Sequence, residues 1–529
     1  MKTSIRFLPV LLLLVAAVPA AAQPFAEAKS SVAQYTVANT TPQRSCESLA
    51  GFKGEGITMI QSQIVAATPD APQHCRVRGV IAPEIVFEVN LPDRWNRRFY
   101  MIGNGGHAGE SLDQPGRAAQ RATALSHGFV MAQTNTGHDS QKEPGASFVM
   151  SNPQKAIDYA YRAVHVTADT AKRMARDFYG TPVTFSYWNS CSNGGRQGLI
   201  EAQRYPDDFD GIVAAAPWVD QTGFTVGAIW NQRAITEAPI PATKLSMVAE
   251  RVIAKCDGVD GLVDGLIDDP RACTFDPAVD VRACSAGTDA ADCLTPAQAT
   301  TLKKIHSGPV SNGNPFFPGF MYGSETAWAN MIVPTKPDAR PADFNLAENT
   351  IRYLAFDPPQ PTYDFMTFDF DRDIGVLDRW GKLANAKDPD LSAFRKSGGK
   401  LLMTYGWADS ILQPMMGVNY YEQVMARHGA STQEFARLFM MPGVAHCGGG
   451  YGPDRHDAVT AVIDWVEKGK APDSMLASRV VDGKVVRTRP LCPYPQVARY
   501  TGQGSIDDAA NFRCTSNAGP GVAAESAPR

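Results

Sequence analysis

Short apolar runs that end in glycine or other small residues alternate along this chain with longer segments of helical periodicity. The short runs occupy residues 98–102, 129–134, 183–188, 212–215, 400–405 and 435–441. Residues 153–179 place apolar side chains at helical spacing behind a proline, and residues 457–468 show the same periodicity. Strands and helices in this order predict an α/β fold, with a mainly parallel sheet covered by helices on both faces.

This alternation stops over residues 220–396, which are rich in proline, aspartate and aromatic residues and contain four of the ten cysteines. The strand pattern resumes after this stretch. We therefore expect a catalytic domain in two parts, residues 23–219 and residues 397–529. Residues 220–396 are expected to form an inserted lid domain.

The amino terminus has the pattern of a secretory signal peptide over residues 1–22. Lys2 and Arg6 precede an apolar run over residues 7–18, and three alanines end at Ala22. The run is shorter than the roughly 18 apolar residues that a bilayer requires, and no second run follows it. We expect the mature chain to begin at Gln23, to be secreted or periplasmic, and to make no membrane contact.

Charge gives no sign of a nucleic-acid partner. Fifty Lys and Arg against 54 Asp and Glu give a formal net charge of −4. Loss of Lys2 and Arg6 with the signal peptide makes the net charge −6. Nucleic-acid binding proteins carry an excess of positive charge, so we expect a small-molecule substrate instead.

Ten cysteines remain in the predicted mature chain. They are Cys46, Cys75, Cys191, Cys256, Cys273, Cys284, Cys293, Cys447, Cys492 and Cys514. An even number of cysteines in an exported chain favours disulfides, and the sequence contains no CxxC pair that would favour zinc or redox chemistry.

A candidate nucleophile follows the run at residues 183–188. The sequence continues as NSCSNGG over residues 189–195 and then shows a helical pattern over residues 199–204. A strand, a sharp turn with a serine and a helix form a nucleophile elbow, in which the helix amino terminus faces the serine oxygen. Ser192 is the predicted nucleophile, although Ser190 stands where the usual GxSxG pattern has glycine. On this motif alone, a glycine-rich turn with an incidental serine is the alternative.

A serine hydroxyl needs a base to remove its proton, and that base needs an acid to orient it. Asp409 follows the run at residues 400–405, and His446 follows the run at residues 435–441. The order Ser, Asp, His along the chain is the α/β-hydrolase order. Taken alone, Asp409 could be a turn or helix-capping residue, and His446 could be a loop histidine without a role. Because both follow the expected strands in the expected order, a triad is favoured.

Cysteines stand next to both the predicted nucleophile and the predicted base. Cys191 precedes Ser192, and Cys447 follows His446. A bridge between them would fix the base relative to the nucleophile and close a very long loop, which entropy models equate with about 5 kcal/mol.

The chain resembles the tannase and feruloyl esterase family, which includes hydrolases of mono(2-hydroxyethyl) terephthalate. The resemblance rests on the motif CSxGGR at residues 191–196, on Asp409 and on the His446-Cys447 pair, and residues 103–106 and the acidic loop after Cys256 also look like family features. It covers nearly all of the mature chain. It implies an α/β-hydrolase fold, the triad of Ser192, Asp409 and His446, and the Cys191–Cys447 bridge.

The oxyanion of such an enzyme needs two donors. The backbone N–H of Asn193, which follows the nucleophile, is expected to supply one. The loop Gly103-Asn104-Gly105-Gly106 is expected to supply the other, and Gly106 is the first choice with Gly105 next. A plain tight turn is the alternative for this loop without the resemblance.

The acidic loop at residues 256–268 interleaves four aspartates with glycines, and the first three stand at relative positions 1, 4 and 8, unlike the ligands of an EF-hand. The resemblance implies that this loop holds a structural Ca²⁺. The side chains of Asp257, Asp260 and Asp264 and the carbonyls of Leu262 and Leu266 would be the ligands. A solvated acidic turn is the alternative.

The other eight cysteines fit local pairs, although sequence does not fix their connectivity. The expected pairs are Cys256 with Cys273, Cys284 with Cys293, Cys492 with Cys514, and Cys46 with Cys75. His165 and Arg196 are expected to be structural. Five tryptophans are assigned no role, because large aromatic residues usually lie in the core: Trp218, Trp230, Trp328, Trp380 and Trp407.

The sequence predicts a secreted serine carboxylester hydrolase that acts on esters of aromatic acids through an acyl-enzyme. By resemblance, hydroxycinnamate esters come first, gallate esters second and terephthalate monoesters third. A non-catalytic, calcium-stabilised binding module is the alternative from another class, and an intact triad speaks against it. A serine peptidase would share the triad, and assays of p-nitrophenyl esters beside peptide anilides separate the two.

Overall fold

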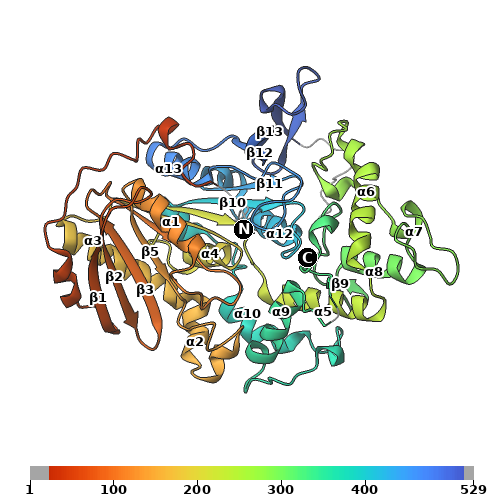
Figure 1. The fold of residues 1–529 in the computed structure, drawn as a ribbon, viewed down its shortest axis with the longest axis horizontal. Coiled ribbons are helices and arrows are strands. Elements are labelled where there is room, and N and C mark those ends of the chain that lie inside the picture. Colours follow the sequence, from red (N-terminus) through yellow and green to blue (C-terminus); the bar gives the residue numbers. More distant parts are fainter. Residues whose placement is uncertain (1–22, 337, 517–529) are drawn as a thin grey trace, which may run out of the picture.

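A computed structural model describes residues 23–336 and 338–516 (Figure 1). The predicted signal peptide, residues 1–22, lies outside the described residues, as does the end of the chain from residue 517. Among the described residues, no helix combines the length and the apolar character needed to cross a membrane.

A nine-stranded sheet forms the centre of the molecule, with strand order β1-β2-β3-β5-β4-β6-β7-β10-β11. The six strands from β5 to β11 in this order pair in parallel, as predicted, while β1, β2 and β3 add an antiparallel edge. The strands are β1 (Ile57–Val65), β2 (His74–Ile81), β3 (Ile85–Pro92), β4 (Arg98–Ile102), β5 (Val130–Thr134), β6 (Phe185–Cys191), β7 (Gly211–Ala215), β10 (Lys400–Gly406) and β11 (Ala436–Met441).

Both faces of the sheet are buried. On β4, Phe99 and Met101 belong to one hydrophobic cluster, while Tyr100 and Ile102 belong to another. Alternate side chains of a strand point to opposite faces, so helices must cover both sides. The first cluster includes residues of α3, α4 and α12, and the second includes residues of α1 and α13. These helices are α1 (Pro115–Ser126), α3 (Ala163–Tyr179), α4 (Asn193–Arg204), α12 (Pro414–His428) and α13 (Ala458–Lys468).

Two predicted helices differ in detail from the observed ones. The helix expected over residues 153–179 consists of α2 (Gln154–Ile157), a π-helical turn at Asp158–Arg162, and α3. The helix expected at residues 199–204 already begins at Asn193, because the elbow turns within one residue. Strand β6 correspondingly extends to Cys191, where it still pairs with Ala215 of β7.

Residues 220–396, the lid segment, are mainly helical and lie to the right and below the sheet in Figure 1. Part of the lid segment has its own core, which includes Leu245, Leu302 and Trp328. Other lid residues, such as Phe224 and Ile351, join the cluster under the sheet. Its elements are α5 (Gln221–Glu237), α6 (Leu245–Cys256), α7 (Pro277–Asp280), α8 (Pro296–Ser307), β8 (Val310–Ser311), β9 (Asn314–Pro315), α9 (Ala342–Asn349), a π-helical turn (Thr350–Ala355), α10 (Asp378–Ala384) and α11 (Ser392–Lys396).

Two small antiparallel ribbons follow α13. Strands β12 (Met475–Val481) and β13 (Lys484–Leu491) form one, and β14 (Gln496–Tyr500) and β15 (Phe512–Ser516) form the other. The first ribbon projects at the top of Figure 1. The sequence pattern did not lead us to expect these ribbons.

Candidate active site

Ser192 stands alone between β6 and α4, in a backbone conformation that few residues adopt. Its φ is 65° and its ψ is −126°. Its N–H donates to the carbonyl of Ala215 at 3.0 Å, and its own carbonyl accepts from Trp218 N–H at 3.1 Å. A non-glycine residue at positive φ is strained, and such strain is concentrated at functional sites where the surroundings enforce it. The sequence-predicted elbow is therefore present in the structure.

The turn is possible because glycines follow the serine. A Cβ on Gly194 would lie 1.9 Å from Ser190 Oγ, and a Cβ on Gly195 would lie 2.5 Å from the Ala215 carbonyl oxygen. Neither position tolerates a side chain without movement of the elbow. Ser190 takes the place of the usual glycine without distorting the turn, because Gly194 leaves room for its hydroxyl.

Asp409 and His446 meet beyond the ends of β10 and β11. Asp409 Oδ2 accepts a hydrogen bond from His446 Nδ1 at 2.8 Å, and Asp409 Oδ1 accepts from the N–H groups of Ile411 and Leu412, each at 2.9 Å. The aspartate is fully buried, whereas the histidine side chain is about one-fifth exposed. A carboxylate held by three donors fixes the imidazole with Nδ1–H toward the aspartate, which leaves Nε2 free to accept a proton.

The two loops that carry the acid and the base pack directly on each other. A Cβ on Gly406, at the end of β10, would lie 2.1 Å from the carbonyl oxygen of Val444. Ala408 N–H also donates to that carbonyl at 3.0 Å. Glycine at this position lets the histidine loop approach the aspartate loop closely.

The expected cysteine pairs are all present. Cys191 is bonded to Cys447, with a Cα–Cα distance of 5.9 Å across 256 positions of chain. A ring nitrogen of His446 and the two sulfur atoms of this bridge lie within 4.8 Å of one another. The disulfide thus joins the residue before Ser192 to the residue after His446. The other pairs are Cys46–Cys75, Cys256–Cys273, Cys284–Cys293 and Cys492–Cys514.

Replacing Cys191 and Cys447 together by serine is expected to lower kcat about 100-fold, because a shift of about 1 Å between reacting groups has an effect of that order. The Cys284/Cys293 double serine variant is the control, since that bridge closes only 9 positions of lid chain. The control is expected to lose stability and keep kcat. Steady-state kinetics and melting curves measure both; full kcat in a folded Cys191/Cys447 variant would contradict the prediction.

The glycine loop after β4 lies against the elbow. Asn104 N–H donates to Gln197 Oε1 of α4 at 3.0 Å. Gly105 N–H is already engaged, since it donates to Glu110 Oε1 at 2.8 Å. Among the hydrogen bonds of the described residues, none uses the N–H of Gly106 or of Asn193. Of the two glycines considered from sequence, Gly106 is therefore the one whose N–H remains available.

Gly106 has a φ of 46°, and the Leu346 side chain of α9 lies 3.5 Å from the place where its Cβ would stand. The next residue, His107, has its Nε2 3.0 Å from Thr350 Oγ1 in the lid segment. Burial lowers the pKa of His107 to about 3, so this imidazole is neutral at ordinary pH. The lid segment thus contacts the glycine loop directly.

The acidic loop between α6 and Cys273 is tightly folded on its own backbone. Asp257 accepts from the N–H groups of Asp264 and Gly265, and Asp264 pairs with Arg489 of β13. Burial, followed by the neighbouring Asp260, raises the pKa of Asp268 well above its ordinary value. Carboxylates and backbone carbonyls are oxygen ligands of the kind that Ca²⁺ prefers, and the close Asp260–Asp268 pair is the part of the loop that fits a cation.

Sequence reasoning did not include Asp268 or Arg489 in that loop. Asp268 belongs to the same acidic run and was a visible candidate, but the family ligand set did not include it. Arg489 lies on a distant strand, so nothing in the local pattern pointed to it.

Two groups of side chains in the described part of the chain bring three possible metal ligands within 4.8 Å of one another, and both lie outside the acidic loop. One is His446 with the two disulfide sulfurs, which are not free thiolates. The other is His165, Glu201 and Asp208, where His165 Nδ1 lies 2.6 Å from Asp208 Oδ2. Asp208 also forms an ion pair with Lys172, whose Nζ lies 3.4 Å from Asp208 Oδ1. Because this lysine already balances the charge of Asp208, we assign the group no metal.

Arg196 is structural, as predicted. It is fully buried, and its guanidinium donates to the backbone carbonyls of Ala160, Ala384 and Tyr159. Of the five tryptophans without an assigned role, Trp218, Trp328, Trp380 and Trp407 are buried.

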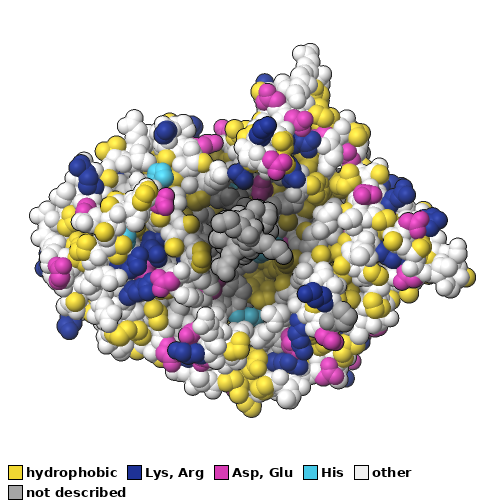
Figure 2. Space-filling view, in the orientation of Figure 1, with side chains coloured by type: hydrophobic (Ala, Val, Ile, Leu, Met, Phe, Trp, Pro, Cys, Tyr) yellow, Lys and Arg dark blue, Asp and Glu magenta, His cyan; other side chains and the backbone are white. Residues whose placement is uncertain are grey.

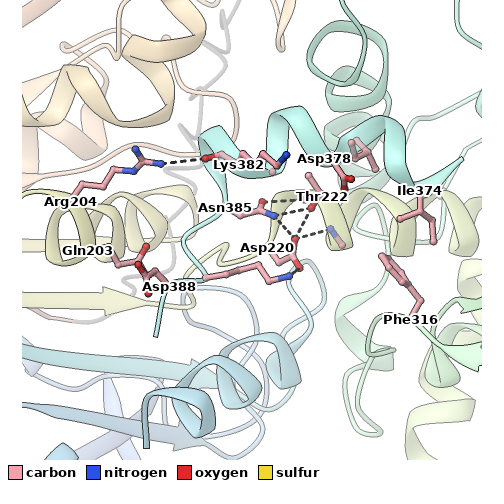
Figure 3. Close-up of a pocket in the computed structure, with 14 residues that line it drawn as sticks. Gln203, Arg204, Asp220, Thr222, Phe316, Ile374, Asp378, Lys382, Asn385 and Asp388 are labelled. Atoms are coloured by element: carbon pink, nitrogen blue, oxygen red, sulfur yellow. Dashed lines mark hydrogen bonds and ion pairs between the residues drawn. The ribbon is translucent and has the colours of Figure 1, made fainter. Parts of the chain in front are cut away.

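A cavity of about 800 Å³ opens between α4, α10 and the start of α5 (Figure 3). None of Ser192, Asp409 and His446 lines it. Its central carboxylate, Asp220, is held by Thr222, Asn385 and Lys387. Because the hydrogen bonds and charge of Asp220 are satisfied by these neighbours, we assign the cavity no catalytic role. Figure 2 shows recessed surface beside the centre of the face in view, with hydrophobic side chains below it.

A parallel sheet, a strained serine at the elbow after β6, and an Asp–His pair after the next strands define a serine hydrolase with the α/β-hydrolase fold. The family model described as "Tannase and feruloyl esterase" matches residues 70–515, and the chain belongs to this family. It is a carboxylic ester hydrolase.

Similarity to individual proteins extends over most of the chain. A mono(2-hydroxyethyl) terephthalate hydrolase of Piscinibacter sakaiensis is 32% identical, over 89% of this chain and 91% of that protein. A probable feruloyl esterase of Arthroderma benhamiae is 33% identical, over 81% and 82%. The crystal structure of feruloyl esterase B from Aspergillus oryzae is 27% identical with a TM-score of 0.77, covering 89% of this chain and 100% of that one.

Proposed function

We propose that this protein hydrolyses esters of aromatic acids with Ser192 as nucleophile, His446 as base and Asp409 as the residue that orients the base. The observation that carries the proposal is the Asp409–His446 hydrogen bond of 2.8 Å, held next to the Ser192 elbow by the Cys191–Cys447 bridge. A serine, a base and an orienting acid on fixed backbone are what acyl transfer requires.

The reaction proceeds in two halves. His446 Nε2 takes the proton of Ser192 Oγ, which bonds to the ester carbonyl carbon, and the resulting oxyanion accepts from the N–H groups of Gly106 and Asn193. When the tetrahedral intermediate collapses, the C–O bond to the alcohol breaks and His446 gives the alcohol its proton. Water then attacks the acyl carbon while His446 takes a proton from it, and the acid leaves as the bond between the acyl carbon and Ser192 Oγ breaks and His446 returns the proton to that oxygen.

The names of the relatives support an aromatic acyl group. Hydroxycinnamate esters come first, because several relatives are named feruloyl esterases. Gallate esters follow from the family description, and terephthalate monoesters from the relative named for them. The contact of Leu346 with the glycine loop supports a substrate pocket to which the lid segment contributes.

The test is a panel of methyl ferulate, methyl gallate and mono(2-hydroxyethyl) terephthalate with purified enzyme, beside p-nitrophenyl acetate and a peptide anilide. We expect kcat/KM to be highest for methyl ferulate. Hydrolysis of the anilide alone would favour the peptidase, and no hydrolysis of any compound would overturn the proposal. Secretion belongs to the same proposal, and amino-terminal sequencing of the exported protein should begin at Gln23.

We also propose that the acidic loop binds Ca²⁺ as a structural ion. Asp257, Asp260 and Asp264 would provide carboxylates and Leu262 and Leu266 would provide carbonyls, with Asp268 as an addition from the structure. The ion would neutralise the repulsion between these carboxylates and fix the loop that the Cys256–Cys273 bridge encloses.

Chelation of calcium is expected to lower the melting temperature by several degrees, since an ion present at 100 times its Kd stabilises the folded state by about 2.7 kcal/mol. Melting curves with EGTA, with EGTA plus excess calcium, and metal analysis of the purified protein measure this. The Asp260→Asn/Asp268→Asn variant is expected to lose the response to EGTA. An unchanged melting curve and no bound calcium would identify the loop as a solvated acidic turn.

A further inference from the structure

Tyr159 joins the two predicted halves of the oxyanion hole. Its hydroxyl oxygen lies 3.0 Å from the Gly106 carbonyl oxygen and 3.2 Å from Asn193 Oδ1. The side chain is buried, with an exposed fraction of 1%. It belongs to the π-helical turn Asp158–Arg162, and such turns are frequent at functional sites. Sequence reasoning missed this residue because it reads as one more apolar position of a helix.

The direction of these hydrogen bonds follows from groups that only donate. Trp380 Nε1–H donates to Gln221 Oε1 at 3.0 Å, so the Gln221 amide nitrogen must face the other way. That nitrogen donates to the Tyr159 hydroxyl oxygen at 2.8 Å. The hydroxyl proton of Tyr159 must therefore point away from Gln221, toward Gly106 and Asn193.

Between these two acceptors, the Gly106 carbonyl has the greater need of the proton. Asn193 Oδ1 already accepts from Arg196 Nε at 2.7 Å, whereas Gly106 O has the shorter contact with Tyr159. Burial raises the pKa of Tyr159, so the phenol keeps its proton at working pH. The Arg196 guanidinium lies over the Tyr159 ring, 5.0 Å from its centre, and packs against it.

We propose that Tyr159 is a positioning residue that holds the Gly106 and Asn193 backbone N–H groups at the separation the oxyanion needs. The inference rests on the proposed function. Gly106 at a φ of 46° has no side chain to restrain it, and Tyr159 holds its carbonyl while its N–H stays available for the oxyanion. The Gln221–Trp380 pair extends this restraint into the lid segment, because Gln221 begins α5 and Trp380 lies in α10.

The test compares Tyr159→Phe with Tyr421→Phe. Tyr421 is an equally buried tyrosine whose hydroxyl donates to the Ala436 carbonyl at 2.9 Å and accepts from Gln433 Nε2 at 3.0 Å, so both variants lose the same two kinds of hydrogen bond. Tyr159→Phe is expected to lower kcat at least about tenfold with KM changed less than about twofold, because loss of oxyanion stabilisation acts on the transition state. Tyr421→Phe is expected to keep kcat within about twofold of the wild type.

Binding of two inhibitors separates positioning from general loosening of the site. Phenylboronic acid forms a boron–oxygen bond to the nucleophilic serine, and the tetrahedral adduct places an oxygen in the oxyanion hole. Its Ki is expected to rise in Tyr159→Phe by the factor by which kcat/KM falls, while the Ki of ferulate, which forms no adduct, stays unchanged. Equal weakening of both inhibitors would indicate a merely structural role and overturn the proposal.

Gln221→Met provides a second variant, since it removes the donor that turns the Tyr159 proton toward Gly106. We expect a smaller fall in kcat with the same unchanged KM. Wild-type kcat in both Tyr159→Phe and Gln221→Met would overturn the inference and leave the proposed esterase function intact. Absence of ester hydrolysis by the wild-type protein would instead overturn the function itself.

Discussion

Replacement of Ser192 by alanine is expected to abolish ester hydrolysis and leave the fold intact. The hydroxyl is half-buried on the elbow, and its removal opens no cavity in the core. Loss of a nucleophilic serine in a serine hydrolase lowers kcat by about 10⁶-fold, because no other group forms the acyl-enzyme. Turnover of methyl ferulate, circular dichroism and labelling by a fluorophosphonate, followed by mass spectrometry, measure the three consequences.

Ser190→Gly is the matched control for this variant. It removes a hydroxyl two residues earlier on β6 and restores the residue that the elbow pattern usually has. We expect it to keep activity and to be labelled on Ser192. If Ser192→Ala turned over ester at the wild-type rate, or if the label were found on another residue, Ser192 would have no part in the mechanism.

Replacement of Asp409 by asparagine is expected to lower kcat about 10⁴-fold, the loss seen when the orienting acid of a triad becomes an amide. Asparagine can still accept from Ile411 and Leu412 N–H through its oxygen, so its amide N–H₂ faces His446. The imidazole must then accept at Nδ1 and carry its proton on Nε2, where it can no longer take the proton of Ser192. Stability should change little.

Asp454→Asn is the control for that loop. Asp454 Oδ2 accepts from Gly449 N–H at 2.8 Å in the same histidine-bearing loop but makes no hydrogen bond to His446. We expect it to change kcat far less than Asp409→Asn. Kinetics across pH and melting curves for both variants measure the difference; equal losses in kcat would mean that Asp409 only supports the loop.

The strands that carry the chemistry were predictable because each is a short apolar run whose end is marked locally. The runs before Ser192, Asp409 and His446 became β6, β10 and β11, with ends within a few residues of those expected. The five disulfides are the expected pairs, although the sequence left the connectivity of the four local ones open and the Cys191–Cys447 bridge was implied by the family resemblance. Local sequence determines the strands and their ends because strand, turn and glycine preferences act over a few residues.

Features that depend on residues distant in the chain were decided only by the tertiary structure. Strands β1, β2 and β3 form the antiparallel edge of the sheet. The direction in which a strand runs depends on which strand it pairs with, and the local sequence of a strand does not specify that partner. The lid segment reads as one insertion, yet Phe224 and Ile351 join the core under the sheet while Trp328 packs in a separate one.

The same division holds within the site. The sequence by itself predicted Ser192, Asp409 and His446 as the triad, because each stands in a recognisable local motif at a strand end. Only the fold decided that Gly105 N–H is taken by Glu110, and that Tyr159 reaches both Gly106 and Asn193. A hydrogen-bond network has no sequence period, since its members come from separate elements and meet only when helix and sheet packing brings them within about 3 Å of one another.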